Sequence, residues 1–179
     1  GLNKNITFQQ LYDYSKINLN VYVTNLNKFS YECYNYETHA EMKVLDAVYR
    51  SCSLPFIFQP ECCENEWIVD GGLINPYPIQ QALEDHKVEE ILGFKIKDEE
   101  LDSCPQNSSI FHFGYYVIMK LIRQNERLNN SYDKNVKELI IPATSMNIED
   151  AKLLINNKIE RQRVFDLGKK YAKLFLTYK

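Results

Sequence analysis

The chain has 179 residues, a formal net charge of −3 at pH 7, and contents of 45% hydrophobic and 13% aromatic residues. This length suits a single domain that buries about 70% of its unfolded surface, and the slightly negative charge gives no general reason to expect a nucleic-acid partner. No apolar run approaches the roughly 18 residues of a membrane-spanning helix, and no signal peptide is visible, so we expect a cytoplasmic protein.

The first half of the chain is predicted to mix helices and strands. Thr7 is placed to cap the first helix, and Pro55 stops the second. Alternating apolar and polar residues indicate a strand from Leu19 to Leu26, and a turn near Glu64-Asn65 should precede the strand that ends before Asp70. The predicted elements are a helix over 6–16, strands over 19–26 and 29–36, a helix over 41–53 and a strand over 63–69.

The second half also alternates helices and strands, which indicates an α/β sheet with helices on its faces. Its predicted elements are helices over 79–86, 109–129 and 147–178, strands over 88–97 and 136–142, and a loop over 98–109. The long central helix should bury the apolar row formed by Phe113, Val117, Leu121 and Leu128. The last helix, which should be broken near Asn156-Asn157, carries the row Val164, Leu167, Tyr171, Leu174 and Tyr178.

Cysteine and histidine spacing gives no sign of a metal site. The five cysteines are odd in number, Cys62 and Cys63 are adjacent, and no C-x-x-C spacing occurs, so we expect reduced thiols. His39, His86 and His112 do not lie at ligand spacing from a cysteine or a second histidine. No cluster of the calcium-binding EF-hand type is present either.

The segment Trp67 to Pro78 is the strongest functional candidate. A short apolar strand ends in Asp70 and is followed by Gly71 and Gly72. A carboxylate at the end of such a strand is an exposed, reactive position. The glycines permit close approach because they lack Cβ and tolerate positive φ. Asp-Gly is also a common turn dipeptide, so a plain turn is the alternative on spacing alone.

Four segments together resemble the second half of a patatin-like phospholipase domain. They are Val21–Leu26, the helix end Ser51–Phe56, Asp70-Gly71-Gly72 and Asn75-Pro76-Tyr77-Pro78. The resemblance is clear over residues 7–79 and fades over 80–179. It implies a patatin-like three-layer α/β/α sheet that is incomplete in this chain, with residues 1–179 forming the C-terminal part of a single domain.

The resemblance implies a lipid acyl hydrolase of the phospholipase A or lysophospholipase type. Such enzymes use a Ser–Asp dyad, with the serine in a Gly-x-Ser-x-Gly elbow and an oxyanion hole in a glycine-rich loop further upstream. Asp70 matches the dyad aspartate and would be the general base, while Gly71, Gly72 and Asn75 would shape the turn beside it. The dyad requires neither a histidine nor a cofactor, and the substrate would be a lipid or phospholipid.

The chain departs from the family pattern because its six glycines build no Gly-x-Ser-x-Gly motif and no glycine-rich loop. Ser51 and Ser53 lack flanking glycines and match packing positions. Either the serine lies on a missing N-terminal segment or a second chain, or the protein is a non-catalytic scaffold that binds lipid or a protein partner. Under the first alternative, the strand over 19–26 would have an unpaired edge that the missing part covers.

The C-terminal helix is strongly basic. From Lys158 to Lys179 it carries seven basic and two acidic residues. One interpretation is peripheral contact with an anionic membrane surface. The alternative is a helix packed on the protein with a solvated basic face.

Overall fold

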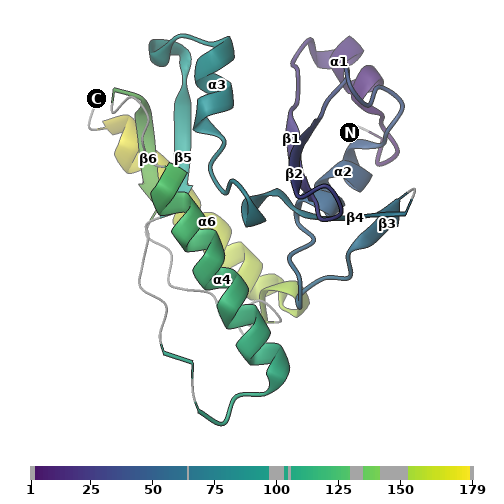
Figure 1. Ribbon diagram of the computed structural model, residues 1–179. Helices are drawn as coiled ribbons and strands as arrows, with labels where there is room; N and C mark the ends of the chain where they lie inside the picture. Colours follow the sequence, from purple (N-terminus) through teal and green to yellow (C-terminus); the bar gives the residue numbers. More distant parts are fainter. Residues whose placement is uncertain are drawn as a thin grey trace. The chain divides into compact units, whose positions relative to one another are not determined.

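A computed structural model of the chain describes residues 3–63, 65–96, 103–104, 106–129, 135–141 and 153–177. They form two compact units, one of residues 1–76 with 107–129 and the other of residues 77–106 with 130–179. Both units combine helices with strands (Figure 1), which confirms the predicted α/β class. The three-layer arrangement stays a prediction.

The first unit is built on a four-stranded antiparallel sheet. Its strands, in the order β2-β1-β4-β3, are β2 (Ser30–Tyr34), β1 (Val21–Asn25), β4 (Glu66–Asp70) and β3 (Glu61–Cys63). Val23 of β1 is paired with Glu32 on one side and with Asp70 on the other. The prediction that strand 19–26 has an unpaired edge is therefore wrong, because β2 folds back onto it as a hairpin and β4 pairs with its other edge.

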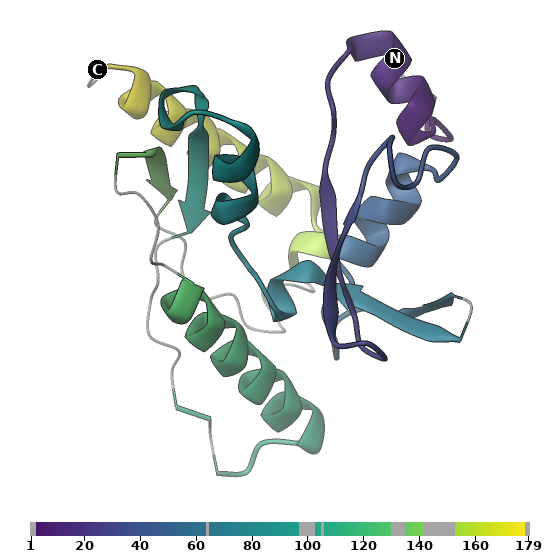
Figure 2. The same ribbon diagram turned by 45° about the horizontal axis from the view of Figure 1, so that its top comes forward.

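The core of this unit lies between the sheet and α2 (Val44–Ser51), which packs on one sheet face (Figure 2). Ala47 of α2 and Val23 of β1 are fully buried there, together with Phe8 of α1 (Phe8–Ser15). The predicted cap of α1 is confirmed, because Thr7 Oγ1 accepts a hydrogen bond from the Gln10 N–H at 3.2 Å. The α2 helix begins at residue 44 rather than 41, because Lys43 is extended and bridges Thr7.

The sequence missed strand β3. The predicted turn before β4 lies in the right place, with Asn65 in the left-handed region at φ 66°, where asparagine is well tolerated. The residues before this turn, Glu61 to Cys63, pair with Ile68 to Glu66 of β4. The three-residue strand is too short for its alternation to be recognised in the sequence.

The buried side predicted for α4 (Ile110–Asn129) is wrong. Phe113, Val117 and Leu121 are 53%, 38% and 54% exposed. The half-buried residues of the helix include Ile118, Met119 and Ile122, which lie on its other side. At the border of the two sides, Asn125 Nδ2 donates to the Leu73 carbonyl at 2.8 Å. The helix carries two apolar rows, and periodicity alone cannot decide which one is buried.

The second unit contains a two-stranded parallel sheet of β5 (Leu92–Ile96) and β6 (Lys137–Ile141). Its helices are α3 (Ile79–Asp85), the 3-10 turn η2 (Val88–Glu90) and α6 (Lys158–Thr177). The predicted helix break is confirmed at Asn157, whose Oδ1 accepts from the Ile159 N–H at 2.9 Å and so caps α6. The predicted helical residues 147–152 and Tyr178 lie outside the described residues.

Two isoleucines test the assignment of the core. Ile68 of β4 is 3% exposed, whereas Ile110 of α4 is 75% exposed. We expect Ile68→Ala to lower the free energy of unfolding by about 2–5 kcal/mol and Ile110→Ala to change it by less than about 0.5 kcal/mol. Urea denaturation followed by circular dichroism measures both. Equal losses would show that the outer row of α4 is covered in solution.

Candidate active site

Strand pairing sets the position of Asp70. Ile68 and Val69, the two residues before it, are buried at 3% and 0% exposure, which anchors the end of β4 between β1 and β3. The Asp70 N–H donates to the carbonyl of Ser53 at 3.2 Å. The half-buried Asp70 thus leaves the sheet at a point fixed by a neighbouring strand and by the end of α2.

The carboxylate of Asp70 caps the turn that follows. Residues Gly71–Leu73 form the 3-10 turn η1, and Asp70 Oδ1 accepts from the Gly72 N–H at 2.7 Å. The Asn75 N–H donates to the Gly71 carbonyl at 3.1 Å, which closes the turn. The structure therefore brings together Asp70, Gly71, Gly72 and Asn75, the four residues predicted to form and shape the site.

The two glycines are needed for space rather than for positive φ, which neither of them has. A Cβ on Gly71 would lie 2.5 Å from the carbonyl oxygen of Tyr22 in β1. A Cβ on Gly72 would lie 2.9 Å from Asp70 Oδ1. Gly71 allows β1 to approach closely, and Gly72 leaves room for the Asp70 carboxylate. The sequence prediction that these glycines permit close approach is confirmed.

Burial raises the pKa of the Asp70 carboxyl above its ordinary value, and the hydrogen bond from Gly72 N–H opposes the rise. Among the described residues, Asp70 Oδ2 has no hydrogen-bond partner. A general base works best when its pKa is close to the working pH. The site therefore holds one carboxylate oxygen in place and leaves the other available to take a proton.

The two serines near Asp70 have structural positions. Ser53 is completely buried, and its Oγ–H donates to the Tyr49 carbonyl at 2.7 Å. Ser51 is the last residue of α2. The packing role predicted for Ser53 agrees with this geometry, because its hydroxyl is turned back onto the helix and is closed to solvent.

Cys52 lies between these serines and was not considered as a site residue from the sequence. Burial raises the pKa of its thiol, and the charge of Asp70 raises it further. A thiol is nucleophilic as the thiolate, which a raised pKa suppresses at neutral pH. Cys52 is thus close enough to the carboxylate to respond to its charge, but the raised pKa makes it a poor nucleophile.

The contribution of α4 to this region also escaped the sequence analysis. The ring of Phe56 lies against Gly114 of α4, where a Cβ would come within 2.6 Å of it, and contacts Phe111 edge-on at 6.4 Å between ring centroids. Phe56 has a φ of 71°, a strained value for a bulky residue. The aromatic loop after α2 is held against α4, and Asn125 ties the same helix to η1.

The histidines have no link to Asp70. The His39 ring lies tilted against Tyr34, with 4.0 Å between the ring centroids, and burial lowers the pKa of His39. His86 is the residue that follows α3, and His112 lies in the first turn of α4. Within the described ranges, no group of three His, Cys, Asp or Glu side chains could hold a metal ion.

The structure defines a mixed α/β protein whose turn after β4 presents a half-buried carboxylate. Residues 3–83, the N-terminal part of the chain, match the family model of the patatin-like phospholipases. This segment is therefore similar to patatin-like phospholipases, and the resemblance predicted from the sequence is confirmed.

Two relatives match parts of the chain. The protein named "Probable lipid hydrolase 463L" of Invertebrate iridescent virus 6 is 31% identical over 85 residues, which are 48% of this chain and 29% of that protein. The uncharacterized protein YqhO of Bacillus subtilis (strain 168) is 25% identical over 140 residues, which are 74% of this chain and 46% of that protein. The chain therefore spans less than half the length of either relative. No solved structure was found to match it.

The raised pKa of Asp70 predicts a stability effect with a defined sign. A carboxyl whose pKa is raised by folding binds its proton more tightly in the folded state, so stability falls as the pH rises through this range. Asp70→Asn removes the buried charge and should increase the free energy of unfolding at pH 7. The gain should vanish below about pH 3, where the carboxyl is protonated in both states.

Urea denaturation at a series of pH values measures this gain. Glu66→Gln, at the other end of β4, is the matched control because its pKa is lowered, chiefly by hydrogen bonding to Lys28. That control should lose stability at pH 7, and the loss should fade as the pH falls. A loss at pH 7 in Asp70→Asn would contradict the assigned burial of the carboxylate.

The glycine contacts predict an order of stability losses. Gly71→Ala places a Cβ against the fixed backbone of Tyr22 and should cost about 1–3 kcal/mol. Gly72→Ala meets only the Asp70 side chain, which can rotate, so its loss should be smaller. Thermal unfolding measures the order, and NMR titration of Asp70 should show a shifted pKa in Gly72→Ala. The reverse order of losses would contradict the proposed packing of η1.

Proposed function

We propose that this chain supplies the general base, Asp70, of a lipid acyl hydrolase whose serine nucleophile lies outside its 179 residues. The observation that carries the proposal is the state of the carboxylate. Oδ1 is held by the Gly72 N–H at 2.7 Å, and the half-buried group has a raised pKa. A base needs a fixed orientation and a raised proton affinity, and this turn provides both.

The proposed reaction is hydrolysis of a lipid ester, of the phospholipase A or lysophospholipase type. The serine Oγ attacks the ester carbonyl carbon while Asp70 accepts the proton of the serine hydroxyl. This step forms a tetrahedral intermediate. The intermediate collapses, and the leaving alcohol takes the proton from Asp70. Water then hydrolyses the acyl-enzyme by the same transfers in order, returning a carboxylic acid and the free serine. No cofactor takes part in these steps.

The rest of the domain is part of the proposal. The family match covers residues 3–83, and the matched stretches span 29% and 46% of the two relatives. We infer that both units belong to one patatin-like domain, which a further N-terminal segment or a second chain completes. The partner of Asp70 would come from that part, together with the donors that stabilise the oxyanion, each worth about 3–4 kcal/mol.

The second candidate is a scaffold that binds lipid or a protein partner without catalysis. It is favoured by the glycine positions, because Gly1, Gly71, Gly72, Gly93, Gly114 and Gly168 form no Gly-x-Ser-x-Gly motif in this chain. The intact turn around Asp70 favours the hydrolase, because a scaffold has no need of a buried carboxylate that lowers its stability.

The full-length protein decides between the two candidates. We expect it to label with a fluorophosphonate and to hydrolyse a short-chain ester. Asp70→Asn should reduce the rate by about 10²–10⁴-fold, with an unchanged circular dichroism spectrum. Glu66→Gln removes a charge from the same strand and should retain the rate. If no serine of the intact protein is labelled, the hydrolase proposal is wrong and the scaffold proposal remains.

A further inference from the structure

The outward side of α6 is the largest concentration of positive charge in the described residues. Between Lys158 and Thr177 the helix has six basic and two acidic residues, in a chain whose net charge is −3. The helix buries none of its residues completely, and it packs along β6 within the second unit. Its half-buried residues, Glu160, Tyr171, Ala172 and Phe175, mark the side that faces inward.

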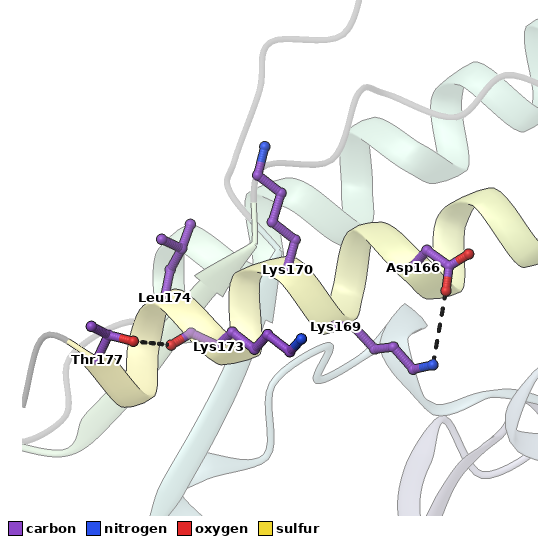
Figure 3. Close-up of a pocket in the computed structure, with 6 residues that line it drawn as sticks. All are labelled: Asp166, Lys169, Lys170, Lys173, Leu174 and Thr177. Atoms are coloured by element: carbon purple, nitrogen blue, oxygen red, sulfur yellow. Dashed lines mark hydrogen bonds and ion pairs between the residues drawn. The ribbon is translucent and has the colours of Figure 1, made fainter.

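Three lysines gather on the opposite side. Lys169, Lys170 and Lys173 line a shallow pocket of about 330 Å³ with Asp166, Leu174 and Thr177 (Figure 3). Lys169 Nζ lies 3.9 Å from Asp166 Oδ1, and both side chains are 58% exposed. Such an exposed ion pair is weak and is screened by salt. Lys170 and Lys173 have no acidic partner among the described residues. The face therefore has uncompensated positive charge.

Exposed apolar side chains flank these lysines. Phe165 and Leu176 are 59% and 66% exposed and follow the side of the helix that carries Lys169, because residues four and seven apart share a face. The Lys169 ammonium lies 4.6 Å from the centroid of the Phe165 ring. The surface thus combines lysines that reach outward with large apolar groups beside them.

We propose that this face of α6, defined by Phe165, Lys169, Lys170, Lys173 and Leu176, binds the surface of an anionic lipid bilayer. Basic residues on an amphipathic helix are attracted to anionic headgroups. Apolar side chains at the flank add binding when they enter the boundary between headgroups and acyl chains. A purely polar polyanion would meet the lysines but would leave Phe165 and Leu176 in water. The sequence left two interpretations of this helix, packing on the protein and contact with a membrane. In our proposal the inward side of α6 packs on the protein and the outward side contacts the membrane.

The helix lies along the surface and does not cross the bilayer. No helix among the described residues is long and apolar enough to span a membrane. The attraction comes from exposed charges, so it must weaken with salt, because the screening length falls from about 10 Å at 0.1 M to about 3 Å at 1 M. The proposed binding does not rest on Asp70 chemistry.

Co-sedimentation of the full-length protein with vesicles tests the proposal. We expect binding to phosphatidylcholine vesicles that contain phosphatidylserine and little binding to phosphatidylcholine alone. The triple variant Lys169→Gln/Lys170→Gln/Lys173→Gln should weaken binding by on the order of 100-fold, because each lysine near the surface contributes about fivefold. The variant Lys4→Gln/Lys43→Gln/Lys87→Gln is the matched control. It removes the same charge from exposed sites elsewhere and should change binding by less than about threefold.

A second variant separates the apolar contribution from the charge. Phe165→Ser/Leu176→Ser should weaken binding while leaving its salt dependence unchanged, whereas the lysine variant should reduce the salt dependence. Short-chain ester hydrolysis should be unchanged in both variants, so a failure of membrane binding is distinguishable from a failure of the hydrolase. Three results would overturn the proposal: equal binding to both vesicle types, wild-type binding by the lysine variant, or self-association through this face without vesicles.

Discussion

The contact on which the site depends is the approach of Gly71 to the backbone of β1. The carbonyl oxygen of Tyr22 lies only 2.5 Å from where a Cβ of residue 71 would be. Because glycine has no Cβ, β4 can pair with β1 up to Asp70 and turn away immediately afterwards. The Asp70–Gly72 hydrogen bond then fixes the direction of the turn. Strand pairing brings the Asp70 carboxylate to the end of the sheet. The lack of a side chain on Gly71 allows the turn that follows to stay close to β1.

Features determined by neighbouring residues were predictable, and those determined by distant contacts were not. The Thr7 cap, the Asp70 turn and the Asn157 break follow from side chains that bond to backbone within three residues. By contrast, the second edge of β1 is paired by β4, which lies more than forty residues further along the chain. The buried side of α4 likewise depends on Phe56 and Leu73, which its own periodicity does not reveal.

Burial of Asp70 gives the turn its chemical character and also lowers its stability. A plain turn would expose the aspartate to solvent, where its pKa would stay near 4 and it would be a poor base for an alcohol. Here burial raises the pKa of Asp70, and the same charge raises the pKa of the neighbouring Cys52 thiol. Protein structures keep such unfavourable charges where the surrounding packing enforces them, as β1 and Ser53 do for this residue.

Of the two members of the proposed dyad, only Asp70 is held in position by this chain. Asp70 is positioned by strand pairing and by hydrogen bonds with the backbone of Ser53 and of Gly72, all within the first unit. Ser53 is buried and bonded to Tyr49, and burial raises the pKa of the Cys52 thiol, so neither side chain is well placed to be the nucleophile of the proposed dyad. The Asp70 carboxylate is oriented before any nucleophile reaches it, so it would need little rearrangement to act as the proposed base. Preorganisation of that kind is what makes a fixed polar group effective in catalysis.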